Sequence, residues 1–285
     1  MRIKNNNVIK LITERSYVKR LSIGKAIGLI LVAELLHALM SAIFIVFTEG
    51  IAGNLSEVQY MWFELITTGI ILRFIATMIV INMYTQHHNE EFKGKKLKIN
   101  YKDYILAIVI MISYILITYG IIDEILFSLP MLIPDELVNI MIEEYEKMTP
   151  AINFVSTVLC AAFFEEIVFR GLVLKGLLNR YSPKKAIIYS AIAFGVIHLN
   201  LPQGLNAFAI GLVFGIIYYY TRSLPLCMAM HATNNFLVDF IIVPDNFMVK
   251  IALYIIIPIV GVLLFRFCSM KLNLRQRAID EDIIL

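Results

Sequence analysis

Long apolar runs dominate this sequence and restrict it to very few folds. Several runs reach the ~20 residues that an α-helix needs to cross a bilayer, and the first, 22–47, is longer than the apolar core of a cleaved signal peptide. Only helices and closed barrels satisfy every backbone polar group within lipid. Hydrophobic residues make up 59% of the chain. We therefore predict an all-α, polytopic transmembrane helical bundle with 1–285 as a single integral membrane domain.

The basic residues predict how this bundle is oriented. If eight spanning helices alternate in direction, 21 of the 25 lysines and arginines fall on one side of the membrane. Because cytoplasmic loops carry the excess of basic residues, both termini are expected in the cytoplasm, at a bacterial plasma membrane. The net charge of +3 follows from this enrichment and indicates the lipid bilayer, and no nucleic acid, as the partner. The eight expected helices are 22–47, 58–84, 104–122, 152–174, 185–200, 205–221, 224–243 and 248–267.

One apolar helix carries three charges in the stretch "AAFFEEIVFRG". A charged side chain at the bilayer centre costs at least ~2.5–3.5 kcal/mol, so these charges need partners or a task. Glu166 and Arg170 are four residues apart, share a helix face and can pair. Glu165 points about 100° away from Glu166. It is left with no local countercharge, which makes it a candidate for a functional role.

Two later helices also place polar side chains within the membrane. "FGVIH" puts Phe194 one turn before His198, and "HATNN" puts His231 and Asn235 on one helix face. A single such residue is common in packed helices, where it serves as interhelical glue. Counted along their helices, however, these side chains and Glu165 can converge in the cytoplasmic half of the bilayer. Together they predict a functional site.

"EEIVFR", "FGVIH" and "HATNN" occur in the order of the motifs EExxxR, FxxxH and HxxxN. In this respect the chain resembles the CAAX-protease and bacteriocin-processing (CPBP) family, also called Abi proteins, which includes the type II CAAX prenyl endopeptidases. The resemblance covers 152–240, the expected catalytic core, and the first three expected spans contain none of it. It implies an intramembrane endopeptidase, a hydrolase that acts on a peptide or a membrane-associated protein.

The resemblance also implies a role for each motif residue. Glu165 matches the general base that activates water, and His198 matches the histidine that helps to hold that water. His231 and Asn235 match the pair that binds the scissile carbonyl oxygen as negative charge develops. The supporting residues are Glu166, Arg170 and Phe194.

The residues themselves leave the question of a metal open. HExxH is absent, but Glu165, His198 and His231 could provide three ligands of a catalytic zinc ion, with water as the fourth. Members of the family are often labelled metalloproteases. Activation of water by a glutamate needs no metal, so zinc is not firmly implied as a cofactor. No serine or cysteine in the motifs has a base at helical spacing, and a covalent nucleophile is not expected.

Two other functions compete with proteolysis. An ion-coupled transporter could use Glu165 and the histidines as a relay, although the paired repeats of many transporters are not visible in the sequence. A non-catalytic bacteriocin self-immunity or regulatory membrane protein is a second alternative, because the family includes such proteins. Elsewhere, Glu34 and Arg73 are expected at similar depth and can form a structural pair, whereas Glu64 has no assigned role.

Overall fold

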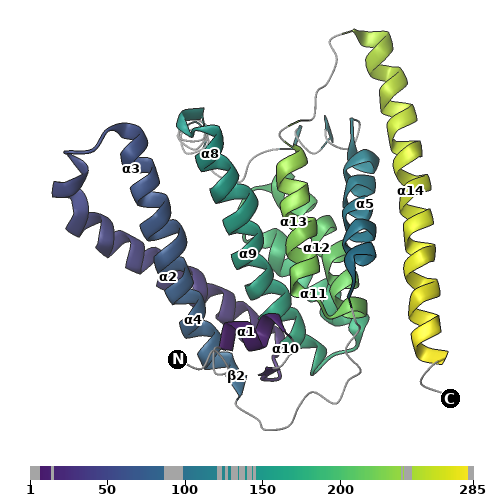
Figure 1. The fold of residues 1–285 in the computed structure, drawn as a ribbon, viewed down its shortest axis with the longest axis horizontal. Helices are drawn as coiled ribbons and strands as arrows, with labels where there is room; N and C mark the ends of the chain where they lie inside the picture. The colour runs from purple at the N-terminus through teal and green to yellow at the C-terminus, as the bar shows by residue number, and fades with distance from the viewer. Residues whose placement is uncertain are drawn as a thin grey trace.

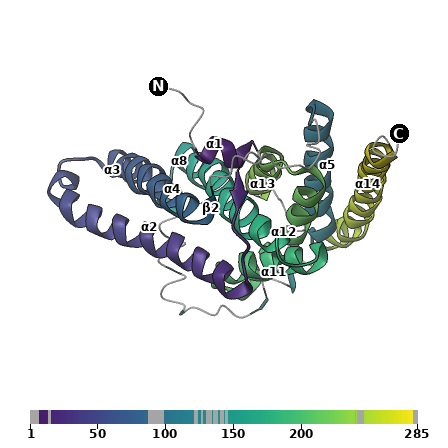
Figure 2. The same cartoon turned by 90° about the horizontal axis from the view of Figure 1, so that it is seen from below.

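The computed structural model describes residues 7–13, 16–86, 99–120, 124–125, 128–129, 134, 139, 143, 146–238, 240 and 246–281. Most of these residues are helical, and the predicted all-α membrane bundle is confirmed. The helices lie roughly alongside one another, with an N-terminal hairpin on one flank, the motif-bearing helices in the centre and two further helices on the opposite flank (Figure 1). The view from below shows the same order (Figure 2).

The N-terminal hairpin consists of one long helix and a return arm of three segments. The outgoing helix is α2 (Ile23–Ala52). Ser56 caps the return arm through a capping box with Gln59, which satisfies two backbone N–H groups at the helix start. The segments of the return arm are α3 (Glu57–Glu64), η2 (Leu65–Leu72) and α4 (Arg73–Tyr84), of which η2 is π-helical.

The central rod of the bundle is a continuous helix, Pro150–Leu178. Thr149 caps its start, and Pro150 occupies the first turn, where its missing N–H has no cost. The rod changes between α- and π-helical geometry along its length. Its segments are α8 (Pro150–Asn153), η3 (Phe154–Cys160), α9 (Ala161–Glu166), η4 (Ile167–Leu174) and α10 (Lys175–Leu178).

Three helices pack around this rod: α11 (Pro183–Val196), α12 (Leu201–Thr221) and α13 (Leu224–Val238). Glycines bring α11 and α12 together, because a Cβ added at Gly195 would lie 2.6 Å from the carbonyl oxygen of Gly204. Small residues allow such backbone contact, which dispersion forces then stabilise in lipid. On the flank, α5 (Tyr101–Thr118) pairs with α14 (Phe247–Glu281), where Gly261 packs against the α5 backbone.

Residues 16–21, directly before α2, form backbone hydrogen bonds near the ends of two other helices. We call this segment the terminal staple. It follows α1 (Asn7–Ile12) and contains β1 (Tyr17–Val18), which pairs antiparallel with β2 (Thr85–Gln86) directly after α4. The Lys19 N–H donates to the Tyr84 carbonyl at 2.9 Å, and the Leu21 N–H donates to the Gly176 carbonyl at 3.0 Å. The staple therefore sets the start of α2, the end of α4 and α10 at the same level. The sequence did not predict these strands, because two residues are too few to show an alternation of apolar and polar side chains.

Each of the eight expected helices has a counterpart in the structure, but the fifth ends at Val196, before His198, and not at 200 as expected. The helices also differ in their capacity to span a membrane. In the described part of the chain, six helices are long and apolar enough to cross. The other two, α11 and α13, contain 14 and 15 residues. At about 1.5 Å per residue each is several ångströms shorter than a hydrocarbon core of about 30 Å. The number of crossings and the side of the termini stay predictions.

Candidate active site

Both glutamates of the first motif lie on α9, the α-helical segment between the π-helical segments η3 and η4. Single π-helical turns insert an extra residue, re-aim the side chains that follow and are frequent at functional sites. The two glutamates have different surroundings. Glu166 is fully buried, whereas the side chain of Glu165 keeps 18% of its surface exposed. As expected from their positions on the helix, they serve different partners.

Glu166 is the centre of a buried charged network. Its Oε1 accepts a hydrogen bond from the Arg170 guanidinium at 2.8 Å, so the expected pair forms. The same oxygen lies 2.9 Å from Nδ1 of His231 on α13. An ionised carboxylate can only accept, and Nδ1 of His231 therefore carries a proton and donates it. This second bond joins helices that are 65 residues apart in sequence and fixes the orientation of the imidazole ring.

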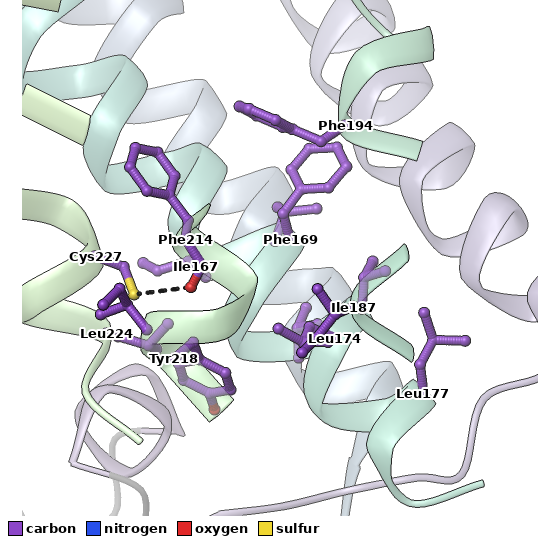
Figure 3. Packing of buried hydrophobic residues seen from close by; sticks show 14 of the residues in the cluster. Ile167, Phe169, Leu174, Leu177, Ile187, Phe194, Phe214, Tyr218, Leu224 and Cys227 are labelled. Carbon is purple, nitrogen blue, oxygen red and sulfur yellow. Dashed lines mark hydrogen bonds between the residues drawn. The ribbon is translucent and has the colours of Figure 1, made fainter. Parts of the chain in front are cut away.

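Two aromatic rings enclose the guanidinium of Arg170. Its central carbon lies 4.5 Å from the ring centre of Phe194 and 4.9 Å from that of Phe214. Both rings also contact His231, at centre-to-centre distances of 6.0 and 5.5 Å. Figure 3 shows Phe194 beside Phe169, and Phe214 across the same core. Buried between two π faces, the cation is stabilised by its ring contacts and by Glu166.

Phe214 is a site residue that the sequence analysis missed. It lies in the apolar run of α12 and belongs to none of the three motifs. A single phenylalanine in an apolar helix cannot be told from the other core residues in the sequence, so it was not predicted as part of the site. Phe194 was found because its motif pairs it with a histidine.

Glu165 stands next to this network without being part of it. Its Oε2 lies 3.9 Å from Nε2 of His231, which is too far for a hydrogen bond. The opposite side of Glu165 borders a small pocket between α9 and the N-terminal hairpin, with a cavity volume of about 10 Å³. Glu165 is thus the carboxylate that borders both this pocket and a histidine of fixed orientation.

His198 follows α11 in a turn, and its Nδ1 lies 2.8 Å from the carbonyl oxygen of Phe194. Because a carbonyl only accepts, Nδ1 carries the proton and the neutral ring keeps a lone pair at Nε2. The ring of Phe194 contacts His198 as well as His231, edge to face, with centres 5.3 Å apart for His198. Phe194 therefore connects the two motif histidines.

Asn235 points from α13 toward the central rod. Its Nδ2 donates to the Thr157 carbonyl at 2.8 Å, and its Oδ1 accepts from Nδ2 of Asn234 at 3.1 Å. An amide nitrogen has two N–H groups, so one remains for another acceptor. Asn234, which has no assigned role in the motifs, orients Asn235 through this bond.

The geometry also bears on the suggested zinc ligands. Within the described residues, no three His, Cys, Asp or Glu side chains are grouped closely enough to hold a metal ion. Glu165, His198 and His231 are all among those residues, and they are not assembled as a three-ligand site. Because Nδ1 of His231 donates to Glu166, only Nε2 of this ring could bind a ligand.

Comparison with known protein families found a match over the motif-bearing part of the chain. Residues 147–237 match the model of the Rce1-like family, described as type II CAAX prenyl endopeptidase Rce1-like. The matched segment is about a third of the chain and runs from the start of the central rod into α13. It contains all three motifs, and the predicted resemblance is confirmed. Searches of curated proteins and of solved structures found no match.

Proposed function

Because residues 147–237 match the Rce1-like family, we propose that this chain is an intramembrane endopeptidase in which Glu165 activates a water molecule. The observation that carries the proposal is the position of Glu165. It is a partly exposed carboxylate at the edge of a pocket, 3.9 Å from a histidine whose other nitrogen is held by a buried ion pair. A structural network would need Glu166 and Arg170 but not Glu165.

The chemistry follows from the arrangement of donors and acceptors. Glu165 takes a proton from water, and the resulting hydroxide attacks the scissile carbonyl carbon to form a tetrahedral intermediate. The remaining O–H group of that water donates a hydrogen bond to the lone pair at Nε2 of His198. As the intermediate collapses, the C–N bond breaks, and the proton on Glu165 passes to the leaving amine. No covalent enzyme intermediate is formed.

The oxyanion of the intermediate needs hydrogen-bond donors. The second N–H of Asn235 is one. His231 donates through Nε2 only as an imidazolium, since its single neutral proton is already on Nδ1. In this role the buried pair Glu166–Arg170 orients a catalytic histidine.

We further propose a peptide or membrane-associated protein as the substrate, and cytoplasmic termini at a bacterial plasma membrane. The distribution of 21 of 25 basic residues supports this orientation. So does the fold, because α1 and the C-terminal end of α14 lie at the same end of the bundle (Figure 1).

Comparative peptidomics of membranes that contain the native chain or Glu165→Gln tests the proposal. Glu165→Gln keeps the shape and polarity of the side chain but removes the base, so cleavage products should disappear while the protein stays inserted and folded. Glu64→Gln, a change of the same type on the hairpin, is the matched control and should keep the products. More than about a tenth of native cleavage by Glu165→Gln would contradict Glu165 as the general base.

The same preparations test whether zinc takes part. We expect graded effects of Glu165, His198 and His231 substitutions, activity in the presence of chelators, and well under one metal ion per active chain by elemental analysis. Loss of activity on chelation and its recovery with added zinc, together with stoichiometric zinc, would replace this mechanism with a metal-assisted one.

A further inference from the structure

A second group of polar side chains faces Glu165 from the N-terminal hairpin. The pocket beside Glu165 is lined by Glu34 and His37 of α2 and by Arg73 of α4, with Phe164 of α9 next to Glu165. None of the three hairpin residues belongs to a family motif, and the matched segment begins only at residue 147. The mechanism above uses none of them.

The terminal staple places these charges at one depth. Arg73 lies 11 residues before Tyr84, about 16 Å along its helix. Glu165 also lies 11 residues before Gly176, across the π-helical segment η4. Since Tyr84 and Gly176 are both bonded to the staple, Arg73 and Glu165 reach the same level of the bundle, where both line one pocket.

Arg73 is incompletely paired at this depth. Its guanidinium lies 3.9 Å from Oε1 of Glu34, beyond hydrogen-bond distance, and 5.6 Å from the ring centre of Phe164. Within the described residues its side chain donates no hydrogen bond. The side chain of Glu34 is 47% exposed and that of Arg73 is 27% exposed. This contrasts with Arg170, which is fully buried and bonded to Glu166.

The remaining polar groups of the pocket are already in use. His37 contacts the Thr68 carbonyl through Nε2 at 2.9 Å, and the Thr77 hydroxyl donates to the Arg73 carbonyl at 2.7 Å. Arg73 is therefore the group in the described pocket with several N–H donors to offer. Its planar fork matches a carboxylate, which it can bind through two parallel hydrogen bonds.

We propose that Arg73 binds a carboxylate of the substrate next to the scissile bond, and that Glu34 occupies this position until the substrate displaces it. The proposal rests on the proposed endopeptidase function, because it places the substrate between Arg73 and Glu165. A substrate carboxylate that takes the place of Glu34 leaves the number of charges around Arg73 unchanged. Glu34 has 47% of its side-chain surface exposed, so packing does not lock it in the pocket.

The proposal predicts opposite effects of two substitutions. Arg73→Gln removes the donor fork and should weaken the binding of a carboxylate, whereas Glu34→Gln removes the resident competitor and should strengthen it. A purely structural ion pair would instead make the two substitutions act in the same direction. Lys250→Gln, which removes a cation from the far flank of the bundle, is the matched control and should have no effect.

Binding can be measured with three synthetic probes on the full-length chain in nanodiscs, in a Glu165→Gln background that prevents turnover. The probes are one apolar peptide of Ala, Leu and Phe as the free acid, the same peptide as the carboxamide, and the carboxamide with one internal Glu. A hydrogen-bonded charge contributes about tenfold or more in Kd. The free acid or the Glu peptide should therefore bind at least about tenfold more tightly than the neutral carboxamide.

The comparison between the two acidic probes shows whether a terminal or a side-chain carboxylate is bound. In Arg73→Gln the advantage over the carboxamide should vanish, while the binding of the carboxamide stays unchanged. Equal binding of all three probes to the Glu165→Gln chain with Arg73 intact, including no binding at all, would overturn the proposal. Equal loss for every probe in Arg73→Gln would do so too. The proposed peptidase function is judged separately, by the loss of cleavage in Glu165→Gln.

Discussion

Replacement of Arg170 by methionine tests the buried network on which the site is built. The substitution keeps much of the side-chain volume but removes the charge from a group that is 1% exposed and bonded at 2.8 Å to the fully buried Glu166. Removal of one partner of a buried ion pair costs about 3–5 kcal/mol, because the other charge is left uncompensated. The contacts with Phe194 and Phe214 add about 0.5–2 kcal/mol each. His231 still donates to Glu166 and offsets part of these costs, so we expect a loss of at least about 3 kcal/mol.

Two comparison variants make this expectation specific. Arg73→Met breaks an ion pair that is 3.9 Å long and partly exposed, so it should cost only about 0–1 kcal/mol. The double variant Glu166→Gln/Arg170→Met leaves no buried charge in the network, and Gln can still accept from His231. It should therefore be more stable than Arg170→Met alone, because no uncompensated charge stays buried.

The free energy of unfolding can be followed by circular dichroism during titration of mixed micelles with a denaturing detergent, for the native chain and all three variants. A loss below about 1 kcal/mol for Arg170→Met would refute the reasoning, since that is the range of a solvated pair. A double variant that is less stable than the single one would refute it as well. Either result would mean that the network does not hold α9 against α13.

Two further predictions concern the oxyanion donor and the outer flank. Asn235→Ala should lower kcat by about 10²–10³ with little change in KM, because a lost oxyanion donor acts only in the transition state. Asn234→Ala, which removes only the group that orients Asn235, should lower kcat less. Steady-state kinetics on a substrate found by peptidomics distinguish the two variants. A raised KM with unchanged kcat for Asn235→Ala would argue against Asn235 as an oxyanion donor. On the flank, hydrogen bonds from Lys250 and Tyr254 hold the pKa of Glu124 below its ordinary value of 4.5. A lowered folded-state pKa stabilises the protein fully above 4.5, and this contribution disappears as the pH falls through the lowered value. The free energy of unfolding of the native chain should therefore exceed that of Glu124→Gln at neutral pH, and this difference should shrink as the pH falls. A difference in unfolding free energy that does not depend on pH would contradict the lowered pKa of Glu124.

The sequence by itself determined the helices and their local pairs. Apolar runs predicted eight helices because each run satisfies its own backbone in lipid, a property of neighbouring residues. The spacing of Glu166 and Arg170 predicted their pair for the same reason, since residues four apart share a face of any α-helix. That local rule also singled out Glu165 as the carboxylate left over.

The tertiary structure alone decided which distant groups meet these residues. The bond from His231 to Glu166 spans 65 positions, and no helical periodicity extends over that distance. Phe214 contacts Arg170 and His231 only because α12 packs against the central rod. The sequence predicted Arg73 near Glu34. Its position opposite Glu165, however, depends on the terminal staple, which bonds to the ends of both helices. Side-chain chemistry and spacing can be read directly from the sequence. The packing of one helix face on another depends on the shapes of all the helices together.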